Sequence, residues 1–97
     1  INDYKEKGEY IGGMKTGKWK AIYINTNKIK FQGEYLNDIE IGRHIYYYSN
    51  GNKRKEGKYK DGEKEGDWKH YNKKGELVVI YFYERGKEIK RDGIKIK

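Results

Sequence analysis

Two histidines, His44 and His70, are the side chains of this 97-residue chain best suited to bind a metal ion or to transfer protons. A metal site needs three or four converging ligands, and the sequence offers no cysteine and no cluster of acidic residues that matches either histidine. A nucleophile would need an adjacent base and an orienting acid, yet the one serine, Ser49, falls in an expected turn. We therefore expect no catalytic residue, no metal site and no cofactor, and we assign both histidines to packing.

Aromatic rings beside cations suggest a second chemistry, the binding of single-stranded nucleic acid. The run Tyr46–Tyr48 lies near Arg43, Arg54 and Lys58, and stacked rings with nearby positive charges suit bases and phosphates. In a strand, however, successive side chains point to opposite faces, so only Tyr47 would share a face with these cations. We therefore favour packing of the three rings within a sheet, and nucleic-acid binding stays an alternative.

The elements that must position these side chains are copies of one unit. Tyr10, Tyr35, Tyr59 and Tyr83 recur at intervals of 25, 24 and 24 residues, and a period of this size marks a repeat array. Alternating aromatic and polar residues, separated by turn residues, predict antiparallel strands joined as hairpins. We therefore predict an all-β fold in a single domain, 1–97, with repeats at about 8–31, 32–55, 56–79 and 80–97, the last of them degenerate.

Two kinds of turn should alternate along the array. Six-residue turns are expected at 11–16, 36–41 and 60–65, which hold glycine, asparagine or aspartate. A tight turn is expected at Asn50 and Gly51, with positive φ at both residues, because Asn-Gly is the strongest short hairpin signal. Lys74 and Gly75 repeat this turn, and Asn25–Asn27 takes its place in the first repeat with one residue more. The longer first turn accounts for the interval of 25.

These turns predict a pairing register in which each large ring lies beside a glycine. Symmetric closure of the six-residue turns would put Tyr10 opposite Gly17, and would pair Tyr35 with Gly42 and Tyr59 with Gly66. The same closure places Trp19 beside Gly8, and the tight turn places it beside Gly33. In the later repeats, His44 should lie between Gly33 and Gly57 in the same way, and Trp68 should lie beside Gly57. A ring that covers bare backbone offsets the intrinsic weakness of glycine in a strand.

Side-chain alternation divides the residues between two faces. The first, the aromatic face, should carry the four repeat tyrosines and Trp19, His44 and Trp68, together with Ala21, Tyr23, Ile29, Phe31, Tyr46, Tyr48, Leu77, Val79 and Tyr81. The second, the basic face, should carry Lys18, Lys20, Lys30, Arg43, Arg54, Lys58 and Lys69 among Ile22, Ile45, Tyr47 and Tyr71. An uncovered aromatic face would expose more contiguous apolar surface than soluble monomers usually tolerate. We therefore expect strong curling of the sheet, a second copy or a partner protein to cover it.

The segment GKYKDGEKEGDWKHYNKKG, residues 57–75, resembles the MORN repeat, and it is most similar to the bacterial variant in proteins described as YwqK-like antitoxins. The resemblance extends from about Gly8 to Ile89. It implies a single-layered, twisted antiparallel sheet with one hairpin per repeat, which acts as an interaction or membrane-proximal module with proteins or acidic lipids as partners. The sequence departs from the pattern where His44 replaces a tryptophan, where Asn27 replaces a turn glycine, and in the last copy, which lacks its second strand motif.

Two functional hypotheses follow from the two faces. The first is binding of a partner protein, such as a cognate toxin, or of a second copy, through the aromatic face or an open sheet edge, with the anchors Tyr10, Trp19, Tyr35, Tyr59 and Trp68. The alternative is a basic-face platform for anionic lipid headgroups or nucleic acid. Its residues would be Lys18, Lys20, Arg43, Arg54, Lys58 and Lys69. No small-molecule substrate is expected under either hypothesis.

Charge and chain ends constrain the partner and the compartment only weakly. The net charge is +8, from 23 basic and 15 acidic residues, but the two signs are interspersed, which favours a role in solubility over a charged block. No apolar run is long enough to span a bilayer. The chain begins at Ile1, so removal of a signal peptide or of an upstream segment stays an open alternative. We expect a cytoplasmic location in preference to a secreted or surface-anchored one, and a spacer within a longer array is a third alternative.

Overall fold

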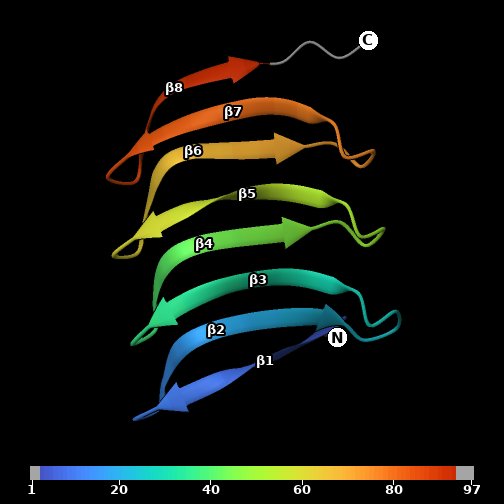
Figure 1. Cartoon of the computed structure of the whole chain (residues 1–97), viewed down its shortest axis with the longest axis vertical. Helices are drawn as coiled ribbons and strands as arrows, with labels where there is room; N and C mark the ends of the chain where they lie inside the picture. The colour runs from blue at the N-terminus through green and yellow to red at the C-terminus, as the bar shows by residue number, and fades with distance from the viewer. Residues whose placement is uncertain (1–2, 94–97) are drawn as a thin grey trace.

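The computed structural model describes residues 3–93, which form eight antiparallel strands in one open sheet (Figure 1). The strands pair in sequence order, so each strand packs mainly against its neighbours along the chain. No helix is present in this part of the chain, and the predicted antiparallel meander is confirmed. The strands are β1 (Tyr4–Ile11), β2 (Met14–Tyr23), β3 (Ile29–Leu36), β4 (Ile39–Tyr47), β5 (Lys53–Lys60), β6 (Glu63–Tyr71), β7 (Leu77–Glu84) and β8 (Lys87–Gly93).

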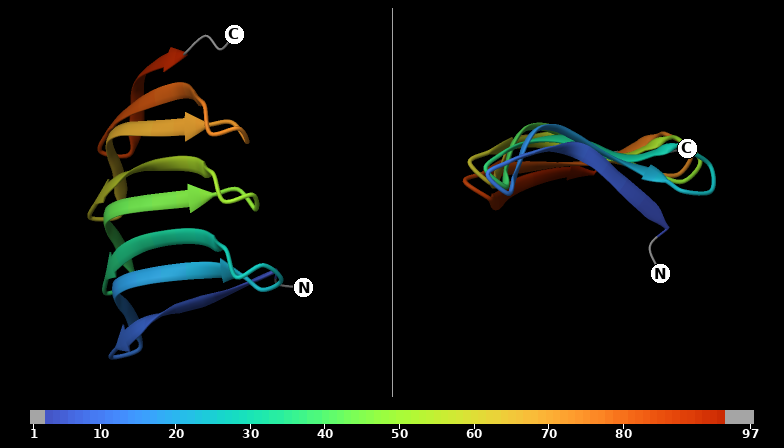
Figure 2. Two further views of the ribbon diagram at one scale, coloured as in Figure 1. Left: turned by 45° about the vertical axis from the view of Figure 1, so that its right-hand side comes forward. Right: turned by 90° about the horizontal axis from the view of Figure 1, so that it is seen from below.

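The sheet is a single layer that bends along its strands. Viewed along the stack of strands, the hairpins nearly superimpose in one bent ribbon, and no second layer formed by residues 3–93 covers either face (Figure 2). The buried core is correspondingly small. Its apolar side chains are Trp19, Ala21 and Trp68, and its polar ones are His44 and Glu56. Burial therefore depends on a few large rings rather than on aliphatic packing.

Two-residue turns, not six-residue turns, close the hairpins β1–β2, β3–β4, β5–β6 and β7–β8. Positive φ occurs at both residues of each turn, at Gly12 and Gly13, Asn37 and Asp38, Asp61 and Gly62, and Arg85 and Gly86. This is the backbone of a type I′ turn, whose twist matches that of the flanking strands. The prediction at 11–16, 36–41 and 60–65 was wrong in length, because the strands continue through the polar residues that flank each pair.

Three-residue loops join the hairpins where the Asn-Gly signal predicted a tight turn. Gly51 has a φ of 96°, while Asn50 is not among the residues with positive φ. The amide of Gly51 donates to the carbonyl oxygen of Tyr48, and the amide of Tyr48 donates to that of Asn52. This pattern is a type I turn followed by one left-handed residue. In the first loop, the amide of Tyr23 donates to the carbonyl oxygen of Lys28. This loop therefore contains one residue more than the loop between Tyr48 and Asn52, which confirms the longer turn predicted there.

Each glycine at the repeat positions 8, 33 and 57 lies opposite a bulge of three residues on the next strand. In the first hairpin Lys7 pairs with Lys20 and Glu9 pairs with Thr16, so Gly8 faces the segment from Gly17 to Trp19. Gly17 adopts a φ of 77°, which favours glycine. A Cβ atom at Gly8 would collide with the Trp19 ring, and equivalent collisions occur at Gly33 with His44 and at Gly57 with Trp68. The predicted cover of each glycine by a ring is confirmed.

The shorter turns overturn the pairing predicted for the tyrosines. Tyr10 pairs with Lys15 rather than with Gly17, because the turn between them is shorter than expected. Gly17 pairs instead with Tyr35 across the next interface. In the later repeats Gly42 pairs with Tyr59 and Gly66 pairs with Tyr83. The predicted pairing of Trp19 with Gly33 and of His44 with Gly57 is confirmed.

A second set of bulges lies near the start of β3, β5 and β7 and changes the predicted faces. Pairing skips Lys30, Arg54 and Val78, which are 24 residues apart. Lys30 and Arg54, predicted on the basic face, therefore approach the aromatic face, where each lies over a tyrosine ring. Ile29 and Leu77, predicted on the aromatic face, pair with Ile22 and Tyr71 and so share the basic face. Simple alternation fails at these points because each bulge adds one residue to one strand.

Candidate functional site: an aromatic face with embedded cations

A ladder of rings runs across the aromatic face. Tyr35, His44, Tyr59, Trp68 and Tyr83 follow one another edge to face, with ring centroids 5.5, 4.7, 5.1 and 6.5 Å apart. Edge-to-face contacts of this kind stabilise aromatic clusters beyond the area they bury. Three of the repeat tyrosines therefore form one continuous structure with His44 and Trp68, while the fourth, Tyr10, contacts Trp19 at a centroid distance of 5.0 Å.

The two indoles of the aromatic face are structural. Trp68 is 0% exposed and Trp19 is 4% exposed. Each indole N–H donates to a backbone carbonyl oxygen of the preceding strand, that of Glu9 at 3.2 Å and that of Lys58 at 3.0 Å. Of the five predicted anchors, these two are inside the fold, where they cannot touch a partner directly.

His44 takes over the role of tryptophan in the second repeat. Its Nε2 atom lies 2.9 Å from the carbonyl oxygen of Glu34, the position equivalent to Glu9 and Lys58. The ring is fully buried, and its Nδ1 atom has no hydrogen-bond partner among the described residues. Burial lowers the pKa of His44, although the carbonyl oxygens of Glu34 and Ile41 oppose this effect. The residue is a neutral core side chain, as the packing assignment predicts.

The other three predicted anchors are accessible. Tyr10 is 62% exposed, and Tyr35 and Tyr59 are half-buried. Burial raises the pKa of Tyr35 and, more strongly, that of Tyr59, so both phenols stay protonated at neutral pH. They can donate hydrogen bonds to a bound partner while their rings supply apolar contact area.

A hollow of about 300 Å³ opens on the same face over β1 to β5. Its walls are mainly aromatic, and the bulge residues Lys30 and Arg54 stand at its border. The Nζ atom of Lys30 lies 4.0 Å from the ring centroid of Tyr4, and the guanidinium of Arg54 lies 6.0 Å from that of Tyr46. The other lining residues are Glu6, Ala21, Tyr23, Phe31, Tyr35 and Tyr47.

The basic face carries a separate groove of about 490 Å³. The exposed cations Lys7, Lys18, Lys20 and Arg43 line it, and Gly8 and Gly33 contribute to its surface. One carboxylate, that of Glu34, lies among them. The structure thus brings together three of the six residues predicted to bind anions, Lys18, Lys20 and Arg43, and adds Lys7.

The remaining predicted anion ligands do not join this groove. Lys58 and Lys69 line a neighbouring depression together with Glu56, Glu65 and Asp67, so their charges are balanced. Arg54 lies by the aromatic face, as described above, because of the bulge in β5.

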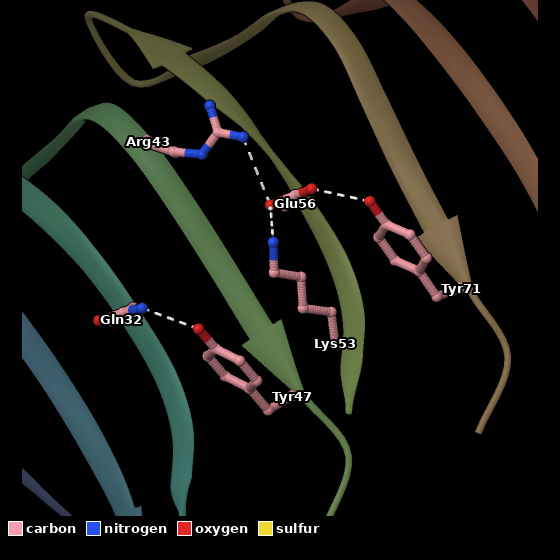
Figure 3. Close-up of polar contacts among 6 residues, drawn as sticks. All are labelled: Gln32, Arg43, Tyr47, Lys53, Glu56 and Tyr71. Carbon is pink, nitrogen blue, oxygen red and sulfur yellow. Dashed lines mark hydrogen bonds and ion pairs between the residues drawn. The ribbon is translucent and has the colours of Figure 1, made fainter. Parts of the chain in front are cut away.

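Sequence reasoning missed a buried carboxylate on the basic face, Glu56, which is 5% exposed (Figure 3). Glu56 accepts a 2.7 Å hydrogen bond from the Tyr71 hydroxyl and pairs with Lys53 at 3.1 Å and with Arg43 at 3.5 Å. Burial alone would raise the pKa of Glu56, but Tyr71 and the two cations lower it below its ordinary value. Burial and Glu56 together raise the pKa of Tyr71 to about 12.

The same contact occurs one repeat earlier in a neutral form. There the amide of Gln32 donates to the Tyr47 hydroxyl at 2.8 Å (Figure 3). Gln32 and Glu56, and likewise Tyr47 and Tyr71, are 24 residues apart. This periodicity was the signal that could have identified Glu56 as a structural residue, and it assigns the cluster to the repeat.

Between residues 3 and 93, no three histidine, aspartate or glutamate side chains gather in a way that could hold a metal ion. In the same range no helix is long and apolar enough to cross a membrane. No protein-family model matches the chain, and a comparison with curated proteins finds no similar sequence.

Proposed function

We propose that the protein is a non-catalytic, MORN-like interaction module that binds a partner protein through its aromatic face. The observation that supports this proposal most directly is the row of half-buried tyrosines on a face that no other part of the described chain covers. Tyrosine combines a rigid apolar ring with a hydrogen-bonding hydroxyl and is enriched at the energetic centres of interfaces. The accessible residues Tyr10, Tyr35 and Tyr59 serve as contacts, and the buried indoles hold them in place.

The experiment compares tyrosines on the two faces. The double variant Tyr35→Ser with Tyr59→Ser should lose capture of the natural partner from an extract of the source organism, whereas Tyr71→Ser on the basic face should retain it, because Tyr71 contacts Glu56 and does not line the aromatic hollow. Circular dichroism melts identify any variant that is unfolded, and such a variant would be replaced by Tyr10→Ser, whose side chain is largely exposed. Retained capture by a folded aromatic-face variant would refute the proposal. Trp68→Ala is unsuitable because its side chain is part of the core.

A second candidate function rests on the groove of the basic face. Four cations around one hollow suit an anionic headgroup or a nucleic-acid phosphate, which matches the lipid or nucleic-acid alternative. Binding of this kind should weaken steeply as salt rises, and reversal of Lys7, Lys18, Lys20 and Arg43 to glutamate should abolish it. If the affinity for anionic vesicles or oligonucleotides does not change with salt concentration, this function is excluded.

A further inference from the structure

The cations embedded in the aromatic face fall into two groups, those that pair with a carboxylate and those that do not. Arg91 belongs to the first group, since it lies over the Tyr81 ring and pairs with Glu88 at 2.9 Å. Towards the N-terminus, Lys15 lies over the rings of Trp19 and Tyr35 and pairs with Glu6 at 2.9 Å. Lys30 lies over the Tyr4 ring and pairs with Asp3 at 3.0 Å. All three charges therefore have a carboxylate partner within the chain.

Three cations between Lys30 and Arg91 in the sequence, Arg54, Lys55 and Lys64, form the second group, here called the cation trio. The Nζ atom of Lys55 lies 4.7 Å from the ring centroid of Tyr46, close to Arg54, and that of Lys64 lies 5.0 Å from the ring of Tyr83. Within residues 3–93, none of the three forms an ion pair. Lys55 and Lys64 are also half-buried, so water compensates their charges only in part.

His70 lies beside the cation trio, and the charges of the trio affect its pKa. It pairs with Lys55 across the β5–β6 interface, and its ring contacts Tyr81 of β7 at a centroid distance of 4.7 Å. Its Nε2 atom is buried and has no partner among the described residues. Burial lowers the pKa of His70, and the charges of Lys55, Lys64 and Arg54 lower it further. The pKa of Lys55 falls through burial and through the other two cations.

We propose that the cation trio is the docking point for an acidic, extended segment of the partner protein, whose carboxylates lie among Arg54, Lys55 and Lys64. The inference rests on the proposed function and names the chemistry of the partner. The ammonium groups of Lys55 and Lys64 lie over the rings of Tyr46 and Tyr83, which would flank the bound carboxylates. Arg54 also borders the aromatic hollow of about 300 Å³, which has room for a large apolar side chain next to the acidic residues.

Charge complementarity favours this occupant over a second copy of the chain. A second copy carries the same net charge of +8. On its aromatic face, Glu6 and Glu88 already pair with Lys15 and Arg91. Glu40, opposite Tyr35, is the one other carboxylate of this face that faces the ring ladder, and it forms no ion pair between residues 3 and 93. A copy thus offers little negative charge to the trio, whereas an acidic segment compensates all three charges at once.

The test uses a synthetic peptide of six glutamates followed by one phenylalanine, with a six-glutamine peptide as its neutral counterpart. In amide and imidazole NMR spectra, the acidic peptide should shift the resonances of Lys55, His70 and Tyr83 and raise the pKa of His70, whereas the neutral peptide should not. The double variant Lys55→Gln with Lys64→Gln should weaken binding about tenfold, the loss expected for two partly screened ion pairs.

The matched control is Lys58→Gln with Lys69→Gln. These lysines lie on the same two strands, β5 and β6, but on the basic face, and their loss changes the net charge equally. If the control weakens peptide binding as much as the trio variant, or if the neutral peptide binds equally well, the inference is overturned. An oligothymidylate that shifts the same resonances more strongly than the peptide would also overturn it, in favour of nucleic acid.

Failure of the inference can be distinguished from failure of the proposed function. If the trio variant captures the natural partner normally while the tyrosine variant loses it, the aromatic face binds a partner but not through acidic residues. If the tyrosine variant retains capture, the proposed function itself is wrong.

Discussion

The Nε2 atom of His44 lies 2.9 Å from the carbonyl oxygen of Glu34 and 3.1 Å from that of Ile41. Both oxygens only accept hydrogen bonds, so Nε2 must carry the proton, and the 3.3 Å approach of the Glu34 amide is not a hydrogen bond. Nδ1 is then the unprotonated nitrogen, and it is buried without a partner in the described part of the chain. A second proton on this ring would introduce an uncompensated charge into the core.

The stability of the protein should therefore decrease as pH falls below about 6.5, the usual pKa of an unfolded histidine. The folded-state pKa values of His44 and His70 are lowered, so in this range the unfolded chain binds protons that the folded chain does not. Stability is complete above pH 6.5 and decreases until the pH passes the folded-state values. The slope should reach at most about 1.4 kcal/mol per pH unit for each histidine, with His70 contributing less because it is partly exposed.

Urea denaturation at pH 7.5, 6.5 and 5.5 measures this slope. His44→Gln should reduce the slope, whatever its effect on stability at pH 7.5. An unchanged slope in this variant would show that His44 is not the group that titrates.

Gly57→Ala should lower the free energy of unfolding by about 2–3 kcal/mol, because the new methyl group would collide with the Trp68 ring and the core is too tightly packed to admit it. The matched control is Gly93→Ala in β8, where a Cβ atom would meet no other group within 4 Å. That change should alter stability by less than about 0.5 kcal/mol. Equal losses in the two variants would contradict the packing of Trp68 over Gly57.

Arg85→Asn should stabilise the protein by about 0.5–1 kcal/mol, measured as an increase in Tm. Arg85 has a φ of 52° at the first position of its turn, where the other three turns carry glycine, asparagine or aspartate. Asparagine tolerates this left-handed conformation better than arginine does. Arg85→Ala removes the same side chain without this advantage and should give no gain. A similar increase for alanine would attribute the effect to the lost charge.

Glu56→Gln should make the protein less sensitive to acid. The folded-state pKa of Glu56 is lowered, so its contribution to stability is complete above the unfolded value of about 4.3 and is lost as pH falls through the folded value. Glutamine at this position reproduces the contact that Gln32 makes with Tyr47, so the loss at pH 7 should be about 1 kcal/mol or less.

Thermal melts at pH 7 and pH 3 compare Glu56→Gln with Glu56→Ala. Alanine leaves the Tyr71 hydroxyl without its partner and should destabilise at both pH values. A glutamine variant that loses stability between pH 7 and pH 3 as steeply as the unaltered chain would disprove the role of Glu56.

The sequence period was sufficient to predict an antiparallel meander of about four hairpins and the cover of glycines by rings, although the last hairpin, β7–β8, is complete where a degenerate copy was expected. The step from Trp19 to His44 to Trp68 is repeated faithfully, and a glycine is the only residue that fits beneath each ring. The turn lengths were less predictable, because Asn50 and Gly51 read as a two-residue turn but form part of a three-residue loop. Local preference for positive φ does not determine how many residues a loop contains.

The candidate site was only partly predictable for a related reason. A bulge adds a residue without changing the amino-acid types around it, so alternation placed Lys30 and Arg54 on the wrong face. The burial of Trp68 depends on its contacts with Gly57, Tyr59 and Tyr83 on both neighbouring strands, which the period alone does not reveal. Sequence therefore identified the rings but not their exposure, and it missed the cation trio.

Backbone hydrogen bonds between successive type I′ turns give the array a further property. The amide of Asp38 donates to the carbonyl oxygen of Lys15, that of Gly62 to Glu40 and that of Gly86 to Lys64. Since each hairpin is tied only to its immediate neighbours, the loss of order should spread inward from the ends of the stack. Amide protons of β4 and β5 should exchange with solvent more slowly than those of β1 and β8. A partner that contacts several hairpins at once would stabilise them against this loss of order.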